Sequence, residues 1–432
     1  MSFSSKKISK FISISFVIIS LSMFLFLFIR SKIYDLSLVY YKKYWILVGI
    51  FFLFSIISFF INHKININLF IITTSILSSI YLIEFTLNIL EWNNRVGDKR
   101  SVNKFYKSKL NEYDQITTLI PPSAFLSYSR NKYFPLSLAP NYFSVTCNET
   151  GQYIINKNDR YGFNTKDQTW DKNEIDFIFL GDSFTYGSCV SQNNNIDGHI
   201  RKISKNKKDI LNLGMPGNGP LISYAALREY FPKKKKIKYI VMFLYINDFQ
   251  NIENEKKNFF LNQYLKNDKF SQNLISRPDY HLKNYLKKNY QRNHQMKFEF
   301  LRLTKLRMLL NSFTMNPYDL EKYYTQDNLN YLKDILLKIN SNYKDSKLFI
   351  VYLPSYSYYF GNKSHILDIQ KKKEELFNEF NNLGLSVLDL DIEFQKIKNK
   401  RSLFSKHKKQ NHYSSYGYET SAKSILSFVN QF

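Results

Sequence analysis

Residues 176–187 read DFIFLGDSFTYG, an apolar run that ends in a small polar turn. Further apolar runs of strand length lie at 210–213, 239–245, 348–353 and 387–390. Helical patterns separate or follow them, at about 194–204, 220–231, 327–340, 366–382 and 416–429. Short apolar strands that alternate with helices are typical of a parallel sheet covered by helices on both faces. The sequence therefore predicts a three-layer α/β domain over 171–432.

Two segments do not fit that alternation. The third and fourth strands are separated by about a hundred residues, which is too long for one crossover connection. We expect a helical insertion there, at about 249–346. Residues 93–170 are polar and contain short β-like pieces at 142–146 and 152–155, so they are interpreted as a connector.

The first 92 residues carry three long apolar runs, at 11–29, 44–61 and about 67–90. The first two contain no charged residue, and the third contains only Glu84, for which we expect a position near the membrane interface. Each is close to the roughly 20 residues that cross a bilayer as a helix. No small-residue cleavage site follows the first run, and another span does, which argues against a signal peptide. We therefore expect three transmembrane helices in residues 1–92, with the lipid bilayer as a partner.

The chain has 432 residues and a formal net charge of +26. Its basic residues are spread along the whole chain, are mostly lysine, and are accompanied by no helix-turn-helix or zinc-finger pattern. We therefore expect no nucleic-acid partner. Two cysteines, Cys147 and Cys189, are too few for a disulfide scaffold or a cysteine-built zinc module. We expect them to be small buried hydrophobic residues rather than a bridge.

Unusual residues follow the first three predicted strands, at 181–187, 212–220 and 245–248, and precede the last helix, at 411–418. In open parallel sheets, ligands bind where the carboxyl ends of the strands meet. A serine on a strand-to-helix turn presents its hydroxyl there, and a histidine can take its proton as general base. Glycine N–H groups and an asparagine amide can donate to a developing oxyanion. The four segments together favour acyl transfer.

In their order and positions, these segments resemble the four blocks of the SGNH (GDSL-like) hydrolases, over about residues 155–432. The blocks are Gly181-Asp182-Ser183, Gly217, Asn247-Asp248 and His412. The resemblance implies a flavodoxin-like fold with Ser183 as nucleophile and His412 as base. It implies an oxyanion hole formed by the backbone of Ser183 and Gly217 with the Asn247 amide, supported by Asp182 and Asp248.

A further element is similar to one found in membrane-anchored bacterial members of that family. It reads Arg160-Tyr161-Gly162-Phe163-Asn164 and is preceded by Asp159. The Asn-Leu-Gly and Gly-Pro steps within 212–220, and the Arg-Glu-Tyr step at 228–230, also resemble this subgroup.

Two positions depart from the family pattern. Tyr245 stands where a glycine usually precedes the Asn-Asp pair, and Lys409 stands where the acid of the catalytic triad usually lies. A lysine cannot hold the imidazole in its working tautomer as a carboxylate does. Three alternatives remain open: a Ser-His dyad oriented by a backbone carbonyl, a substitute carboxylate such as Asp389 or Asp391, or reduced activity.

The expected function is that of a membrane-anchored serine esterase that removes acyl groups, in particular acetyl, from a carbohydrate or envelope glycan. One alternative is an O-acyltransferase that works with membrane proteins of polysaccharide assembly, and another is a catalytically weak scaffold subunit. No metal or organic cofactor is expected, because no His, Cys and carboxylate residues have ligand spacing in the sequence.

The expected location is the bacterial inner membrane, crossed several times, with the catalytic domain expected in the periplasm although the sequence itself leaves its side open. Lysine and arginine residues near the spans favour the cytoplasm, whereas the resemblance to enzymes of envelope glycans favours the periplasm.

Overall fold

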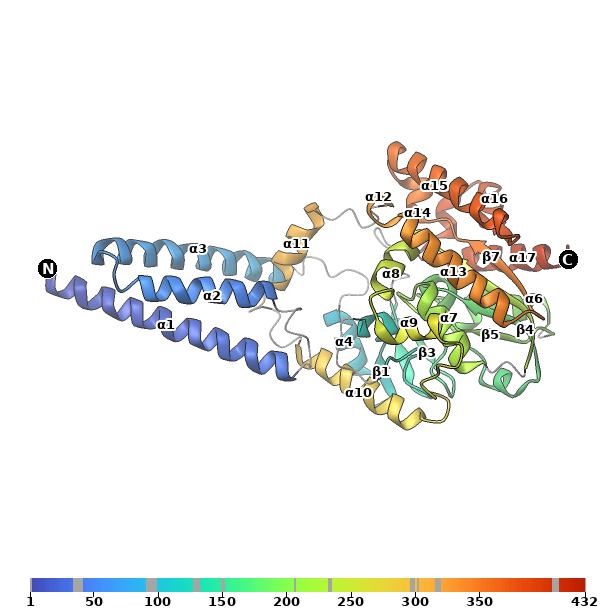
Figure 1. Cartoon of the computed structure of the whole chain (residues 1–432), viewed down its shortest axis with the longest axis horizontal. Coiled ribbons are helices and arrows are strands. Elements are labelled where there is room, and N and C mark those ends of the chain that lie inside the picture. Colours follow the sequence, from blue (N-terminus) through green and yellow to red (C-terminus); the bar gives the residue numbers. More distant parts are fainter. Residues whose placement is uncertain are drawn as a thin grey trace. The chain divides into compact units, whose positions relative to one another are not determined.

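The computed structural model describes residues 2–33, 42–90, 99–126, 133–147, 149, 152–205, 207–231, 235–295, 300, 303–314, 320–405 and 412–431. The chain forms two compact units (Figure 1). The helical unit comprises residues 1–93, 127–132 and 294–315. The α/β unit comprises residues 94–126, 133–293 and 316–432.

The helical unit contains α1 (Ser2–Ile33), α2 (Lys42–Ile57), α3 (His63–Ile89) and α11 (Thr304–Thr314). Two of these helices, α1 and α3, are long and apolar enough to cross a membrane, over Ser4–Ile29 and His63–Ile89. The second of the three expected spans is the shorter apolar helix Tyr44–Ile57. The expectation of three spans is therefore supported, by length and composition, for two of them.

Glu84 is fully buried in α3 and contacts the start of α11. Its two carboxylate oxygens accept hydrogen bonds from the backbone N–H groups of Lys305 (3.1 Å) and Leu306 (2.7 Å). The first N–H groups of a helix have no partner within the helix, and an anion satisfies both them and the helix dipole. The single acidic residue of the third apolar run thus holds a helix that comes from the long insertion.

Replacing Glu84 by glutamine should loosen the start of α11, because the new amide N–H₂ would face a backbone N–H. Hydrogen bonds to charged groups contribute about 1.5–3 kcal/mol, so we expect exchange protection at Leu306 to fall by roughly 10- to 100-fold. Hydrogen–deuterium exchange on the full chain in detergent measures this loss. Glu112→Gln, at an exposed position, is the control. Unchanged protection in Glu84→Gln would contradict the assignment.

The core of the α/β unit is a five-stranded parallel sheet of order β5-β4-β6-β7-β8. This 2-1-3-4-5 order is the flavodoxin-like one. The strands confirm the five predicted from the sequence: β4 (Glu174–Leu180), β5 (Ile210–Asn212), β6 (Lys236–Leu244), β7 (Lys347–Tyr352) and β8 (Ser386–Asp389). Their carboxyl ends lie at one edge of the sheet, so the loops that follow them meet there.

Both faces of this sheet are buried, as the continuous apolar runs predicted. Alternate residues of β4 illustrate this: Ile178 and Leu180 belong to one apolar core, and Phe177 and Phe179 to the other. The first core is covered mainly by α7 (Pro220–Tyr230), α13 (Gln326–Asn342) and α15 (Lys363–Asn382). The second is covered mainly by α6 (Ile196–Ile203), α16 (Leu390–Gln395) and α17 (Ser415–Val429).

Most of the expected connector, residues 94–126 and 133–170, forms part of the α/β unit. Its β pieces belong to a second, three-stranded sheet of β1 (Ile116–Thr118), β2 (Phe143–Val145) and β3 (Ile155–Lys157). The remaining helices are α4 (Lys99–Ser108), α5 (Ser183–Tyr186), α8 (Asp248–Glu255), α9 (Phe259–Lys266), α10 (Pro278–Gln295), α12 (Leu320–Tyr323) and α14 (Tyr356–Phe360). Helices α8 to α13 occupy the long segment between β6 and β7.

Candidate active site

The turn after β4 places Ser183 at the start of α5. Gly181 has φ +155°, and a Cβ atom there would lie 2.3 Å from Thr185 Oγ1, so a side chain is excluded. The Asp182 carboxylate accepts a hydrogen bond from the Phe184 backbone N–H (2.9 Å) and caps the helix. Ser183 therefore follows directly from the strand end, with its side chain partly exposed.

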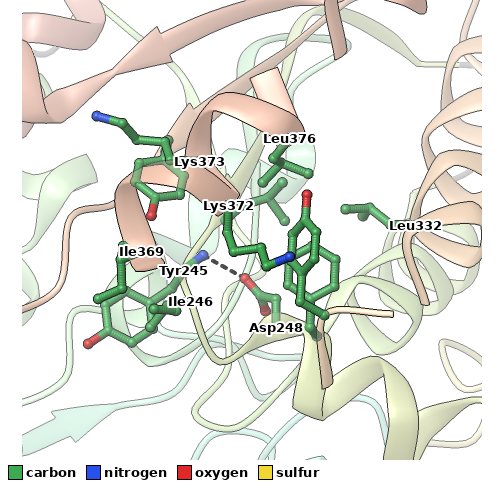
Figure 2. Close-up of a pocket in the computed structure, with 12 residues that line it drawn as sticks. Tyr245, Ile246, Asp248, Leu332, Ile369, Lys372, Lys373 and Leu376 are labelled. Atoms are coloured by element: carbon green, nitrogen blue, oxygen red, sulfur yellow. Dashed lines mark hydrogen bonds between the residues drawn. The ribbon is translucent and has the colours of Figure 1, made fainter. Parts of the chain in front are cut away.

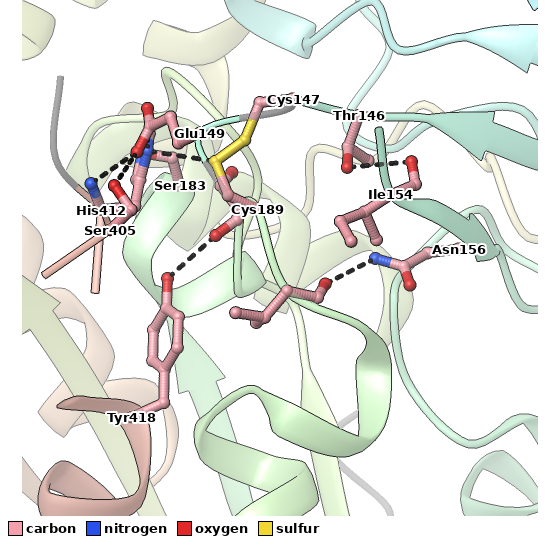
Figure 3. The surroundings of a disulfide bond; sticks show 12 residues. Thr146, Cys147, Glu149, Ile154, Asn156, Ser183, Cys189, Ser405, His412 and Tyr418 are labelled. Carbon is pink, nitrogen blue, oxygen red and sulfur yellow. Dashed lines mark hydrogen bonds and ion pairs between the residues drawn. A yellow bond between two sulfur atoms is a disulfide. The ribbon is translucent and has the colours of Figure 1, made fainter. Parts of the chain in front are cut away.

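His412 lies beside that hydroxyl although 229 residues separate the two in sequence. Its Nε2 atom is 2.8 Å from Ser183 Oγ (Figure 3). The neighbouring Tyr413 is fully buried and pairs with Phe404 in an isolated β-bridge. Ser414 then caps α17 by accepting from the Gly417 N–H (3.1 Å). The structure thus brings together the two residues that the sequence analysis selected as nucleophile and base.

The acid that completes the arrangement is Glu149, a residue that the sequence analysis missed. Glu149 Oε1 lies 2.8 Å from His412 Nδ1, and Oε2 accepts from the His412 backbone N–H (2.9 Å) and from Ser405 Oγ (2.8 Å). Its side chain is 2% exposed. Glu149 belongs to the expected connector and no motif surrounds it, so only its tertiary position reveals it. Lys409, at the usual position of the acid, lies outside the described residues.

Neither carboxylate proposed as a substitute acid contacts the imidazole in the described structure. Asp389 and Asp391 instead accept from the Lys373 ammonium of α15, at 2.9 and 3.0 Å. Asp391 also accepts from the hydroxyls of Tyr358 and Tyr359, at 2.7 Å each. The alternative of Asp389 or Asp391 as the acid is therefore not supported, because Lys373, whose side chain is 12% exposed, and two tyrosines engage them. The carboxylate of Glu149, rather than a backbone carbonyl, contacts the imidazole.

Glu149 and His412 shift each other's pKa values in opposite directions. Burial raises the pKa of Glu149, but the charge of His412 and the hydrogen bonds from His412 and Ser405 outweigh it, so this pKa is lowered. Burial lowers the pKa of His412, but the charge and hydrogen bond of Glu149, together with the charge of Asp182, outweigh it and raise this pKa. The pair therefore favours a Glu149 carboxylate beside an imidazole of increased basicity.

Cys147 and Cys189 form a disulfide next to this pair (Figure 3). The expectation that they are unpaired was wrong, because the fold brings their Cα atoms to 5.1 Å across a sequence separation of 42. Cys147 precedes Glu149 by two residues, and Cys189 follows α5. The bridge thus fastens the loop that carries Glu149 to the segment that carries Ser183.

Removing this bridge should destabilise the α/β unit. In the chain-entropy model, a closed loop of this length corresponds to about 4 kcal/mol. We expect the double variant Cys147→Ala/Cys189→Ala to unfold at a lower temperature than the disulfide-bonded wild type. Both proteins are measured without reductant and with a metal chelator. Adding a reductant should lower the transition of the wild type alone. Equal transitions for the oxidised proteins would contradict a stabilising bridge.

The loop after β5 carries Gly217, the expected second donor of the oxyanion hole. Gly217 has φ +72°, a conformation that favours glycine. The buried Glu255 carboxylate of α8 holds the end of this loop by accepting from the N–H groups of Gly219, Leu221 (3.0 Å) and Ile222 (3.3 Å). The loop is thus anchored at the sheet edge, and donation by Gly217 to an oxyanion stays a prediction.

Asn247 and Asp248 follow β6 and make different contacts. The Asn247 side chain makes no capping hydrogen bond to α8, whereas Asp248 accepts from the Tyr245 backbone N–H (2.6 Å). Burial, with the charge of Asp182, raises the pKa of Asp248 well above its ordinary value. Burial also raises the pKa of Asp182 to about 6, against hydrogen bonding from Phe184 and Asn247. Asp182 and Asp248 thus support the two turns, and the oxyanion role of Asn247 stays a prediction.

Tyr245, where the resembled family usually has glycine, packs against the serine turn. Its ring stacks on Phe184 with centroids 4.4 Å apart. The Phe184 ring in turn lies 4.9 Å from the His412 ring. This departure from the family pattern therefore adds an aromatic wall beside the Ser183–His412 pair.

A mostly apolar pocket of about 400 Å³, including the space at its mouth, lies next to this segment (Figure 2). Tyr245 and Ile246 line it from the turn after β6 and Asp248 from α8, and Lys372 and Leu376 line it from α15. Neither Ser183 nor His412 is among the described residues that line it. The pocket thus borders the Asn247 turn rather than the reacting hydroxyl.

The element over 159–164 forms a turn that is hydrogen-bonded to the end of α5, next to the serine turn. Asp159 Oδ1 accepts from the N–H groups of Tyr161 and Phe163, at 2.8 Å each, and Asn164 Nδ2 donates to the Tyr186 carbonyl of α5 (2.9 Å). Gly162 has φ +93°, and a Cβ atom there would lie 2.2 Å from the Leu138 carbonyl oxygen. The element is therefore structural and fixes the end of α5.

Neither a protein-family model nor a curated protein matches this chain. Similar solved structures include a protein assigned to the G-D-S-L lipolytic family from Desulfitobacterium hafniense, with 13% identity, a TM-score of 0.30, and coverage of 59% of this chain and 99% of that one. Another is a lipase/acylhydrolase from Enterococcus faecalis, with 14% identity, a TM-score of 0.33, and coverage of 59% and 95%. These identities and TM-scores are low, and the likeness carries no conclusion about the chemistry of this chain.

Proposed function

We propose that this chain is a serine-dependent acyl hydrolase. The observation that carries the proposal is the continuous contact from Ser183 Oγ to His412 Nε2 and from His412 Nδ1 to Glu149. A hydroxyl, an imidazole and a buried carboxylate in this order form the nucleophile, base and orienting acid of serine hydrolases. The four sequence blocks, which include all the residues of this contact except Glu149, support the same proposal.

The reaction begins when Ser183 attacks the carbonyl carbon of an ester and His412 Nε2 takes the hydroxyl proton. Glu149 holds the proton on Nδ1, which leaves Nε2 free to act as base, and stabilises the imidazolium that forms. The Ser183 and Gly217 backbone N–H groups and the Asn247 amide would stabilise the oxyanion. His412 then protonates the leaving alcohol, and water releases the acyl group from Ser183.

The proposed substrate is an acylated, in particular acetylated, carbohydrate of the cell envelope, and the proposed location is the bacterial inner membrane. The resemblance of the motifs to those of membrane-anchored envelope enzymes supports both. The two long apolar helices support a membrane anchor. The Cys147–Cys189 bridge favours an oxidising compartment, and therefore a periplasmic α/β unit. Transfer of the acyl group to a sugar hydroxyl, with polysaccharide-assembly proteins as partners, would use the same acyl-enzyme.

The test uses the full chain in detergent with a fluorophosphonate probe, which reacts covalently with an activated serine. We expect one label per chain, located at Ser183 by peptide mass spectrometry, and none in Ser183→Ala. Ser364→Ala, at an exposed position, is the control and should label normally. Release of acetate from an acetylated glycan then tests the substrate class. A folded wild type that neither labels nor hydrolyses p-nitrophenyl acetate would overturn the proposal.

A further inference from the structure

Four metal-binding side chains meet beside the proposed triad. They are Cys147, Glu149, Cys189 and His412, and one donor atom from each lies within 4.8 Å of all the others. Cys189 Sγ is 3.6 Å from His412 Nδ1, and Glu149 Oε1 is 2.8 Å from the same nitrogen. These donors come from three segments that are distant in the sequence, so their linear spacing could not reveal a ligand set.

The donor set is the kind that zinc prefers. Zinc binds thiolate sulfur at about 2.3 Å and imidazole nitrogen or carboxylate oxygen at about 2.0–2.2 Å, in tetrahedral geometry. Such bonds place neighbouring donors roughly 3.3–3.8 Å apart, so the donors here need shifts of about 1 Å to enclose an ion. Glu149 and Cys189 are buried and Cys147 and His412 partly exposed, which leaves a path from solvent. The disulfide occupies both sulfurs in the oxidised chain.

We propose that reduction of the Cys147–Cys189 disulfide converts this cluster into a site for one Zn²⁺. A phosphine reductant gives two electrons to the S–S bond and takes an oxygen atom from water, and the two hydrogens end on the thiols. Binding of Zn²⁺ then releases two protons from the thiols to solvent. The Glu149 carboxylate and the His412 imidazole supply the other two ligands without a net change in their protonation.

Zinc in this position would inactivate the proposed catalytic site, a consequence that rests on the proposed function. Metal on His412 Nδ1 moves the proton of the neutral imidazole to Nε2, where it faces Ser183 Oγ. The base can then no longer accept the serine proton, and Glu149 no longer orients the imidazole. The oxidised chain is the active form, and the reduced, zinc-bound chain is the inactive form.

The test measures metal binding directly, so it does not depend on esterase activity. The full chain in detergent is reduced with a phosphine under anaerobic conditions and titrated with Co²⁺. We expect one equivalent to produce thiolate-to-cobalt charge-transfer absorption and the intense visible bands of tetrahedral Co²⁺. Added Zn²⁺ should remove these bands, because zinc binds such sites more tightly than cobalt. Ser183→Ala should bind like the wild type, and the oxidised chain should not bind.

Matched variants identify the ligands. Cys147→Ala/Cys189→Ala should abolish the charge-transfer band, and Glu149→Gln and His412→Ala should each weaken binding by at least tenfold. His365→Ala and Glu393→Gln replace the same residue types elsewhere in the α/β unit and should bind normally. The proposal is overturned if the reduced, folded chain shows no charge-transfer band, or if His412→Ala and Glu149→Gln bind as tightly as the wild type. Loss of near-ultraviolet circular dichroism on reduction that Zn²⁺ does not restore would also overturn it.

Discussion

Replacement of Ser183 by alanine is expected to lower kcat for hydrolysis of p-nitrophenyl acetate by about 10⁴-fold or more. The hydroxyl that would form the acyl-enzyme is lost, and the 2.8 Å contact to His412 with it. Replacement of His412 by alanine should have an effect of similar size, because a serine without its base is a weak nucleophile at neutral pH. The double variant should be little worse than either single variant, since the two residues act as a unit.

These rates are measured on the full chain in detergent, with circular dichroism to confirm that each variant is folded. His365→Ala is the control for the loss of a histidine and should retain wild-type activity. Additive losses in the double variant would mean that Ser183 and His412 act independently. Equal activity of wild type and Ser183→Ala would remove Ser183 from the reaction.

Replacement of Glu149 by glutamine is expected to lower kcat by about 10³- to 10⁴-fold. The amide can present a donor where the carboxylate accepted from His412 Nδ1, which favours the tautomer with the proton on Nε2. That tautomer cannot accept the serine proton. Asp391→Asn is the matched control. Like Glu149→Gln it removes one buried carboxylate, but Asp391 accepts from Lys373 and does not contact His412. A loss in the control as large as that in Glu149→Gln would contradict Glu149 as the orienting acid.

The same variant should change the pH dependence of the residual activity. The general base must be neutral, so kcat/KM falls as the pH drops through the pKa of His412. In the wild type that pKa is raised above its ordinary value. Burial lowers it, but the charge and hydrogen bond of Glu149, followed by the charge of Asp182, outweigh burial. We therefore expect the acidic limb of the wild-type kcat/KM profile to lie above about pH 6.5, which is the ordinary pKa of histidine. The corresponding limb of Glu149→Gln should lie at lower pH. A limb that does not move would contradict the contribution of Glu149 to the His412 pKa.

The stability that the Glu149–His412 pair contributes to the fold should depend on pH differently from the activity. The lowered pKa of Glu149 contributes stability that is present above its ordinary pKa and is lost as the pH falls through the folded value. The raised pKa of His412 contributes stability that is present below its ordinary pKa and is lost as the pH rises through the folded value. The pair thus stabilises the fold most where His412 is protonated and inactive, and activity rises as part of that stabilisation is lost.

The sheet, the positions of its strands and the segments that surround the proposed nucleophile could be predicted from the amino-acid sequence. Apolar runs of strand length that alternate with helical patterns leave few topologies, and the observed strands coincide with the predicted ones within a few residues. Ser183 and His412 could be selected because each sits in a local motif at the end of a regular element. The local spacing around Gly181, Asp182 and Ser183 specifies the turn geometry directly.

The groups that complete the site could be identified only in the folded chain. Glu149, the Cys147–Cys189 bridge and the partner of Glu84 depend on pairs of residues that are distant in sequence and carry no periodic signal. A buried carboxylate is stable wherever the fold supplies donors or a counter-charge, so its partner cannot be read from its neighbours in the chain. His412 supplied that partner to Glu149, whereas Lys373 supplied it to Asp389 and Asp391. That difference in partners assigned the orienting role to Glu149.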